Sequence, residues 1–332
     1  MRIGVVGAGS WGTTLSDMLA RAGHDVALWA REPEVVESIQ RQRVNELFLP
    51  NSPLDQRLRV AGDIGEVVRG RELLVMAAPS HAMRSVASEV GKALQEERPW
   101  VVSVAKGLEP KTLVVLTDVL EQALPGCPVC ALSGPSFAQE VYQRQPTAVV
   151  AAARELPVAQ AVQQAFAVEY FRVYTSRDVV GVQLGGALKN VIAIAAGILE
   201  GMGLGYNSRA ALITRGLAEM ARLGELMGGE AVTFAGLAGM GDLVLTATGP
   251  LSRNRSLGVE LGKGRGLAEI MSGRRTVAEG VTTAQAAVDL GTRAGVELPI
   301  ATEVARILFD NKTPRQAIRD LMDRELKAEH WR

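Results

Sequence analysis

The sequence begins with a short apolar run that leads directly into three closely spaced glycines. The run is Ile3–Val6, and Gly7, Gly9 and Gly12 behind it form a G-x-G-x-x-G motif that opens a helical pattern; a second strand pattern, His24–Trp29, follows. In such a unit the first glycine permits a tight turn, the second lets the backbone approach a pyrophosphate, and the third allows close helix–strand packing. The pyrophosphate meets the positive end of the helix. The motif therefore predicts a dinucleotide-binding, Rossmann-like fold with these glycines at the cofactor.

Strand and helix patterns continue to alternate to about residue 177. Helical patterns separate most of a series of further apolar runs, namely Leu73–Ala78, Trp100–Ala105, Val129–Leu132, Thr147–Ala151 and Glu169–Tyr174. This alternation is typical of a parallel sheet that is buried on both faces. From residue 178 a long Gly- and Ala-rich helical pattern begins, and strand-like runs nearly disappear. We expect an α/β N-terminal Rossmann-like domain with a mostly parallel sheet at residues 1–177, then an all-α C-terminal domain at 178–332.

The composition excludes several classes of protein. A length of 332 residues suits about two domains, and 36 basic against 36 acidic residues give a net charge of zero, which argues against a DNA- or RNA-binding surface. Cys127 and Cys130 suit a reducing compartment, and with three histidines they supply no zinc-binding set. The apolar run Val191–Leu199 is shorter than the ~20 residues of a membrane span. We expect a cytoplasmic protein that binds neither nucleic acid nor metal and does not span a membrane.

The end of the second strand bears on which dinucleotide binds. An NAD site usually places an acidic residue there, where it binds the ribose hydroxyls. In this chain Arg31 comes first and Glu32 follows. The guanidinium of Arg31 suits the adenosine 2′-phosphate of NADPH. The alternative is a solvated arginine beside Glu32 acting as the acid, so NADPH is the favoured cofactor and NADH remains open.

Polar residues also follow two later strand patterns. Lys106 comes directly after Trp100–Ala105, and Gly134 and Ser136 lie in the turn after Val129–Leu132. The carboxyl ends of strands in an open α/β sheet are where ligand-binding groups gather. These residues are candidates for contact with a ligand.

Lys189 is the most informative polar residue of the long helical pattern. A lysine among Gly, Ala and Ile must hide an unfavourable charge or reach a partner or cleft. Burial lowers the pKa of an ammonium group, as acid–base catalysis near neutrality requires. The alternative is a lysine whose stem covers apolar surface while its head reaches water. Neighbouring Asn190 and the later Asp242 favour the catalytic interpretation.

A second polar loop follows in the helical part. Asp242 and Thr246 lie near the cluster Ser252-Arg253-Asn254. Arg253 could hold two phosphate oxygens at once. The alternative for this cluster is a helix start, because Ser and Asn are good N-caps.

Together these motifs resemble the bacterial NAD(P)-dependent glycerol-3-phosphate dehydrogenases. The matching segments run in consistent order and are Gly7–Gly12, 106–107, 134–138, 188–191, 205–210, 239–243, 252–255 and 277–280. The resemblance implies a Rossmann-like domain, a helical domain, an active site between them and a homodimer. It also implies interconversion of dihydroxyacetone phosphate and sn-glycerol 3-phosphate, which supplies glycerophospholipid synthesis. One departure is Phe48, where this family more often has Tyr.

The resemblance assigns a role to each candidate residue. Lys189 becomes the proton donor and acceptor, with Asn190, Asp242 and Thr246 completing the catalytic group. The residues that it places at the cofactor, in addition to the glycines, are Ser10, Trp11, Arg31, Lys106, Ala138, Arg253, Val277 and Glu279. Those that it places at the substrate are Lys106, Gly134, Ser136, Lys189, Asp242, Ser252, Arg253 and Asn254.

Two other functions remain as alternatives. One is a dehydrogenase of the same two-part architecture that acts on a 3-hydroxy acid. The other is a redox sensor that binds NADPH without turnover, although such a protein has no need of Lys189 or Asp242.

Overall fold

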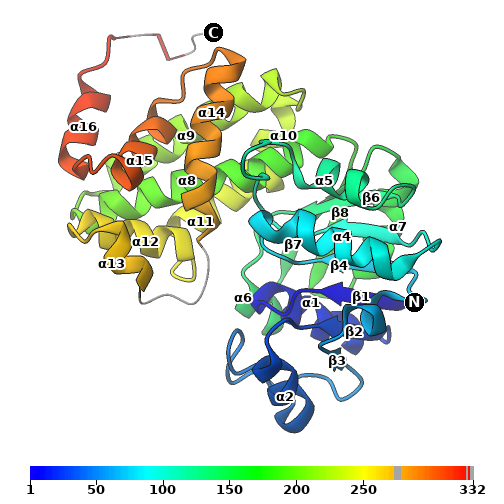
Figure 1. The fold of residues 1–332 in the computed structure, drawn as a ribbon. Coiled ribbons are helices and arrows are strands. Elements are labelled where there is room, and N and C mark those ends of the chain that lie inside the picture. The colour runs from blue at the N-terminus through cyan, green and yellow to red at the C-terminus, as the bar shows by residue number, and fades with distance from the viewer. Residues whose placement is uncertain (273–277, 327, 330–332) are drawn as a thin grey trace.

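The computed structural model describes residues 1–272, 278–326 and 328–329. Figure 1 shows a sheet-containing half beside a helical half. Its eight-stranded sheet has the order β3-β2-β1-β4-β5-β6-β7-β8. The strands are β1 (Arg2–Val6), β2 (Asp25–Trp29), β3 (Arg59–Ala61), β4 (Leu73–Met76), β5 (Trp100–Ser103), β6 (Val129–Ser133), β7 (Thr147–Ala152) and β8 (Phe171–Ser176).

The sheet is mostly parallel, as the sequence predicts. All neighbouring strands from β3 to β6 run parallel, β7 pairs antiparallel with β6, and β8 is parallel to β7. The order 3-2-1-4-5-6 is that of dinucleotide-binding Rossmann folds. The strand β3 was not predicted from sequence, because this three-residue edge strand, in which only Val60 is buried, is too short to show an alternating pattern.

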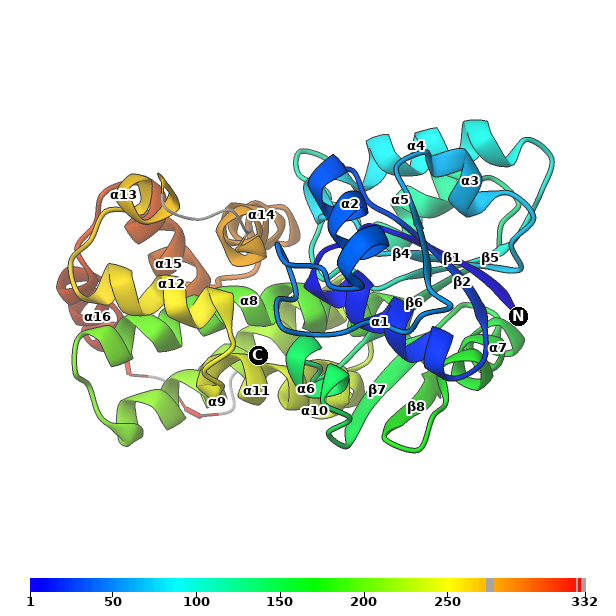
Figure 2. The same ribbon diagram turned by 90° about the horizontal axis from the view of Figure 1, so that it is seen from below.

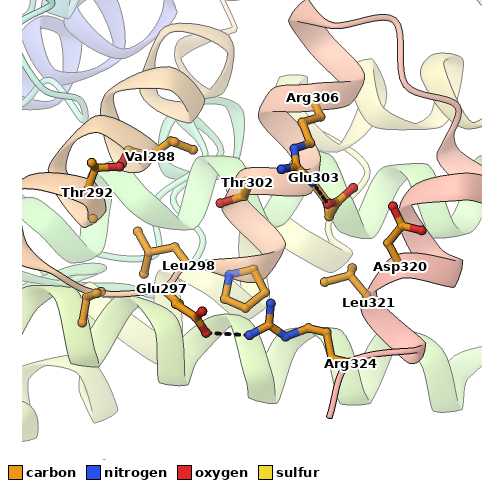
Figure 3. A pocket seen from close by; sticks show the side chains of 13 residues that line it. Val288, Thr292, Glu297, Leu298, Thr302, Glu303, Arg306, Asp320, Leu321 and Arg324 are labelled. Atoms are coloured by element: carbon orange, nitrogen blue, oxygen red, sulfur yellow. Dashed lines mark hydrogen bonds and ion pairs between the residues drawn. The ribbon is translucent and has the colours of Figure 1, made fainter.

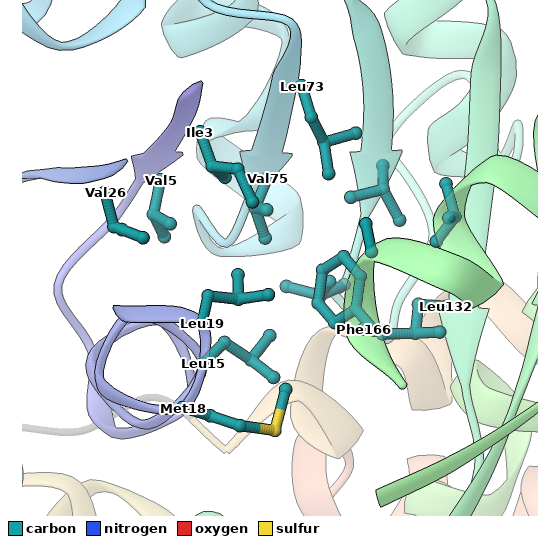
Figure 4. Packing of buried hydrophobic residues seen from close by; sticks show 14 of the residues in the cluster. Ile3, Val5, Leu15, Met18, Leu19, Val26, Leu73, Val75, Leu132 and Phe166 are labelled. Carbon is teal, nitrogen blue, oxygen red and sulfur yellow. The ribbon is translucent and has the colours of Figure 1, made fainter. Parts of the chain in front are cut away.

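Helices cover both faces of the sheet. Figure 4 shows one of these layers, where Leu15 and Leu19 of α1 pack toward Ile3 and Val75 of the sheet, with Phe166 of α7 beside them. Each of these side chains is fully buried. The helices of this half are α1 (Ser10–Arg21), α2 (Pro33–Gln42), α3 (Ile64–Val68), the 3₁₀ turn η1 (Ser80–Ala82), α4 (Met83–Leu94), α5 (Leu116–Ala123), α6 (Ala138–Tyr142) and α7 (Leu156–Phe166).

From residue 179 the described chain is helical, and Figure 2 shows these helices gathered beside the sheet half. They are α8 (Val179–Gly201), α9 (Tyr206–Leu226), α10 (Ala231–Ala235), the π-helical turn η2 (Leu237–Gly241), α11 (Asp242–Thr248), α12 (Arg253–Gly262), α13 (Leu267–Ser272), α14 (Glu279–Ala294), α15 (Pro299–Phe309) and α16 (Pro314–Met322). In length and composition α8 could cross a bilayer, but 94% of its most apolar window is buried inside this protein. It is therefore the central core helix of this half.

Glycines bring α8 and α12 into close contact. A Cβ atom added at Gly197 of α8 would lie 2.0 Å from the backbone oxygen of Arg255, and one at Gly258 of α12 would lie 2.1 Å from that of Ile194. Gly201 and Gly262 approach the opposite helix in the same way. This packing explains why the central helix is rich in small residues, and it fixes the start of α12 beside the polar part of α8.

Candidate active site

The glycine motif forms the turn between β1 and α1. Gly7 has a φ of +119°, and a Cβ added there would lie 2.9 Å from the carbonyl of Ala77. A Cβ at Gly12 would lie 1.9 Å from the oxygen of Gly7, whereas one at Gly9 would meet no atom within 4 Å. The turn is thus closed toward the protein and open at Gly9, and Gly9, at the N-cap of α1, has no side chain that could cap the helix amides. An open backbone at an uncapped helix start fits the pyrophosphate of a dinucleotide.

The other cofactor candidates near this turn make protein contacts of their own. The Ser10 hydroxyl donates to the backbone oxygen of Phe48 at 2.6 Å, and a hydroxyl oxygen that donates can still accept a hydrogen bond. The Trp11 ring is half-buried, with its centroid 6.4 Å from that of Phe171. At the start of α6, the oxygen of Ala138 accepts from Thr14, which ties this segment to α1.

Arg31 follows β2, with 76% of its side chain exposed and its guanidinium 3.0 Å from the carboxylate of Glu32. The pair stands at the strand end next to the glycine turn. This geometry fits both interpretations from sequence: Arg31 as the partner of a 2′-phosphate, or a solvated Arg31 beside Glu32 as the acid that binds the ribose.

Lys189 lies in the buried middle of α8, where its ammonium group has two polar partners. Its Nζ donates to Thr246 Oγ1 at 2.6 Å and is 2.8 Å from Asp242 Oδ1. Its side chain is 6% exposed, so the alternative of a head group in water does not describe it. Burial lowers the pKa of Lys189 to about 8, although Asp242 opposes this shift. An amine with that pKa exchanges protons near neutral pH.

Asp242 joins this lysine to the sheet half. Its Oδ2 is 2.7 Å from the Nζ of Lys106, which follows β5. The same Nζ donates to the oxygen of Gly134 at 2.7 Å and is 3.4 Å from Ser136 Oγ. Groups from two strand ends and two helices therefore meet around one buried carboxylate.

Asparagines extend the network from α8 to α12 and α14. Asn254 Nδ2 donates to Asn190 Oδ1 at 2.9 Å, and Asn254 Oδ1 accepts from the backbone N–H of Gly280 at 3.0 Å. Asn190 in turn donates to the oxygen of Lys106 at 3.5 Å. The Ser252 hydroxyl caps α12 by accepting from the N–H of Arg255, as the helix-start alternative predicts for this residue.

Arg253 and Glu279 border the same region. Partial withdrawal from water lowers the pKa of Arg253, and the nearby Glu279 opposes this effect. Glu279 accepts from the backbone N–H and the hydroxyl of Ser80, at the carboxyl end of β4. Ser80 was not among the residues predicted from sequence, although it follows a strand run as Lys106 does. Val277 lies outside the described residues.

A separate cavity of about 310 Å³ lies in the helical half, between α14, α15 and α16. Figure 3 shows ion pairs among its side chains: Arg324 with Glu297 at 2.6 Å and Arg306 with Glu303 at 2.9 Å. None of the candidate site residues that the structure describes lines it, so it is not part of the site built around Lys189.

Comparison with known proteins identifies the family. Residues 2–159 match the family described as NAD-dependent glycerol-3-phosphate dehydrogenase N-terminus, and residues 178–319 match the corresponding C-terminus. The glycerol-3-phosphate dehydrogenases [NAD(P)+] of Geobacter sulfurreducens and Syntrophotalea carbinolica are 55% and 53% identical, over 99% of this chain and 99% of each relative.

Solved structures agree. The crystal structure of glycerol-3-phosphate dehydrogenase from Coxiella burnetii has a TM-score of 0.93 at 38% identity, covering 97% of this chain and 99% of that one. A ketopantoate reductase from Ralstonia eutropha, at 19% identity and a TM-score of 0.62, shares the fold alone. The chain belongs to the NAD-dependent glycerol-3-phosphate dehydrogenase family.

Proposed function

We propose that the chain interconverts dihydroxyacetone phosphate and sn-glycerol 3-phosphate by hydride transfer with NAD(P)H, and that Lys189 donates and accepts the proton. The observation that carries this proposal is the buried Lys189–Asp242–Lys106 group, in which one carboxylate is within 2.8 Å of two ammonium groups from opposite halves of the chain. Its net charge of about +1 suits an anionic substrate and an oxygen on which negative charge develops.

The proton chemistry follows from the contacts of Lys189. In ketone reduction, its ammonium form protonates the oxygen at C2, and in alcohol oxidation its neutral form removes that proton. Asp242 holds the ammonium group in place, and Thr246 is hydrogen-bonded both to it and, at 3.3 Å, to Asp242. Asn190 lies one residue further along α8 and is fixed by Asn254. These neighbours orient the amine, so its proton is delivered in one direction.

The phosphate group calls for a separate set of residues. Arg253, in the first turn of α12, offers a forked donor that matches two phosphate oxygens. We assign Lys106, Gly134, Ser136, Ser252, Arg253 and Asn254 to the substrate, together with Lys189 and Asp242. Lys106 and Arg253 are also placed at the cofactor.

The cofactor fits the glycine turn. When bound, the nicotinamide supplies or accepts the hydride. We propose that Gly7, Gly9 and Gly12 admit its pyrophosphate, and that the remaining contacts come from Ser10, Trp11, Arg31, Lys106, Ala138, Arg253, Val277 and Glu279. NADPH is the proposed preference, because the guanidinium of Arg31, just after β2, would suit a 2′-phosphate, and NADH is the alternative.

Four further proposals concern the whole protein. We divide the chain into a cofactor domain at 1–177 and a substrate domain at 178–332, since β8 ends at Ser176 and α8 begins at Val179.

We also propose that the protein forms a homodimer, which analytical ultracentrifugation tests by measuring its mass in solution. A cytoplasmic location agrees with the free, buried Cys127 and Cys130. Supply of glycerophospholipid synthesis rests on the proposed product.

One steady-state assay tests the reaction. We expect dihydroxyacetone phosphate to be reduced with at least roughly 100-fold higher kcat/KM than dihydroxyacetone, because a site built around cations for an anion leaves its charges unpaired without the phosphate. Running both ketones with NADPH and with NADH also measures the cofactor preference. Equal use of the two ketones contradicts the assignment of Arg253, and binding of NADPH without any oxidation favours the redox-sensor alternative.

A further inference from the structure

Glu279 begins α14, and both of its carboxylate oxygens are bound by a single residue of the sheet half. The backbone N–H of Ser80 donates to Oε1 at 3.2 Å, and the Ser80 hydroxyl donates to Oε2. The two residues are 199 positions apart in sequence. Ser80 is 2% exposed and opens the 3₁₀ turn that follows β4. The pair is therefore a partly buried, charge-assisted connection between the two halves.

This connection lies against residues on both sides of the site. A Cβ added at Gly107, next to Lys106, would lie 2.7 Å from the Cβ of Ser80 and 3.2 Å from Oε2 of Glu279. On the other side, the N–H of Gly280 donates to Asn254. Glu279 is thus held between the Lys106–Gly107 turn and the asparagine network.

The contacts leave Glu279 able to bind a ligand. An ionised carboxylate has about four lone-pair positions, and Ser80 occupies two of them. The free positions can accept from hydroxyl or amide donors of a dinucleotide. Because the side chain of Ser80 is short and begins in the turn after β4, its bonds fix the direction in which the free lone pairs of Glu279 point.

We infer that Ser80 is a positioning residue, which orients the Glu279 carboxylate toward the dinucleotide and fastens the start of α14 to the end of β4. The inference rests on the proposed contact between Glu279 and the cofactor. Ser80 need not touch the cofactor to act in this way.

The inference is tested by titrating the full-length protein with NADPH in the absence of substrate and measuring binding from the fluorescence of NADPH. We expect Ser80→Ala to weaken NADPH binding roughly 10-fold, the effect of losing one hydrogen bond to a charged group. The KM for NADPH should rise in parallel, with kcat within about twofold of wild type, since the groups around Lys189 are unchanged. Ser85→Ala is the matched control, because its exposed hydroxyl donates only to the nearby oxygen of Ala82, and it should bind NADPH as the wild type does.

A double-mutant cycle separates positioning from a general loss of stability. In a Glu279→Ala background, Ser80→Ala should weaken NADPH binding by less than about twofold, because the partner it orients is gone. Unchanged binding in Ser80→Ala, or an equal loss with and without Glu279, overturns the inference, as does unchanged binding in Glu279→Ala. The titration measures binding and needs no turnover. If the wild type does not reduce dihydroxyacetone phosphate, that result contradicts the proposed reaction, whereas the double-mutant cycle still tests the role of Ser80.

Discussion

At the scale of single residues, the site depends on how Asp242 divides its two oxygens. One is 2.8 Å from Lys189 and the other is 2.7 Å from Lys106. With a side chain only 1% exposed, this carboxylate would be costly to bury alone, and the two lysines would repel each other without it. The three side chains can therefore be buried only together, and their pairing allows the ammonium group of Lys189 to stay inside the protein.

The lowered pKa of Lys189 predicts opposite pH dependences for the two directions. Ketone reduction needs the ammonium form, so kcat should be highest at low pH and fall as pH rises through about 8. Alcohol oxidation needs the neutral amine and should increase through the same range. Asp242→Asn removes the charge that opposes the shift, so the descending limb for reduction should move to lower pH. Rate profiles in both directions measure this.

The control for this experiment is Asp310→Asn, an exposed carboxylate at the end of α15, which should leave both limbs in place. Identical profiles for wild type and Asp242→Asn would remove Asp242 from the control of this proton.

Sequence could predict the residues of the site whose local surroundings were unusual. Lys189 stood out because it interrupts an apolar helix, and Lys106 because it follows a strand. Ser80 also follows a strand run, but its role could not be predicted from sequence, since its partner Glu279 is 199 positions away. Nor could sequence decide between the two roles of Ser252, because a capping serine and a ligand-binding serine look alike without the third dimension.

At the scale of elements, α8 shows what periodicity reveals and what it omits. The small and apolar residues of 178–199 predicted one long helix, and in the structure it runs from Val179 to Gly201. The pattern did not show that Gly197 and Gly258 allow α12 to lie against its backbone, because that requires knowing which helices meet. The three-residue strand β3 was missed because its pairing with β2 is also a tertiary property.

The contact between α8 and α12 predicts a strong effect of one methyl group. Gly197→Ala places a Cβ 2.0 Å from the oxygen of Arg255 and 2.9 Å from the nitrogen of Val259, and neither backbone atom can move unless the helices separate. We expect a loss of about 1–3 kcal/mol in the free energy of unfolding, measured by urea titration. Gly266→Ala is the control, since its Cβ would meet no atom within 4 Å, and it should change stability by less than about 0.5 kcal/mol. Equal stabilities for the two variants would show that the helices are not held this closely.

At the scale of the whole molecule, hydrogen bonds connect the substrate side of the site, at Lys189, with the cofactor side, at Glu279. Asn254 connects Asn190, beside the catalytic lysine, with Gly280, beside Glu279. Ser80 and Asp242 each add a link from the helical half to the sheet half. A change at Asn254, which bonds to both ends, should therefore reach the substrate side and the cofactor side of the site.

This dependence predicts that Asn254→Ala impairs both ligands. The substitution removes the amide that donates to Asn190 and the oxygen that accepts from the N–H of Gly280. The KM values for dihydroxyacetone phosphate and for NADPH should therefore both rise, each roughly 10-fold. Asn254→Asp keeps the acceptor for Gly280 but places an oxygen against Asn190 Oδ1. Its KM for dihydroxyacetone phosphate should therefore rise more than its KM for NADPH. Asn207→Ala, at an exposed position of α9, is the control. If Asn254→Ala raises only the KM for dihydroxyacetone phosphate, Asn254 acts on the substrate alone and the two ends are independent.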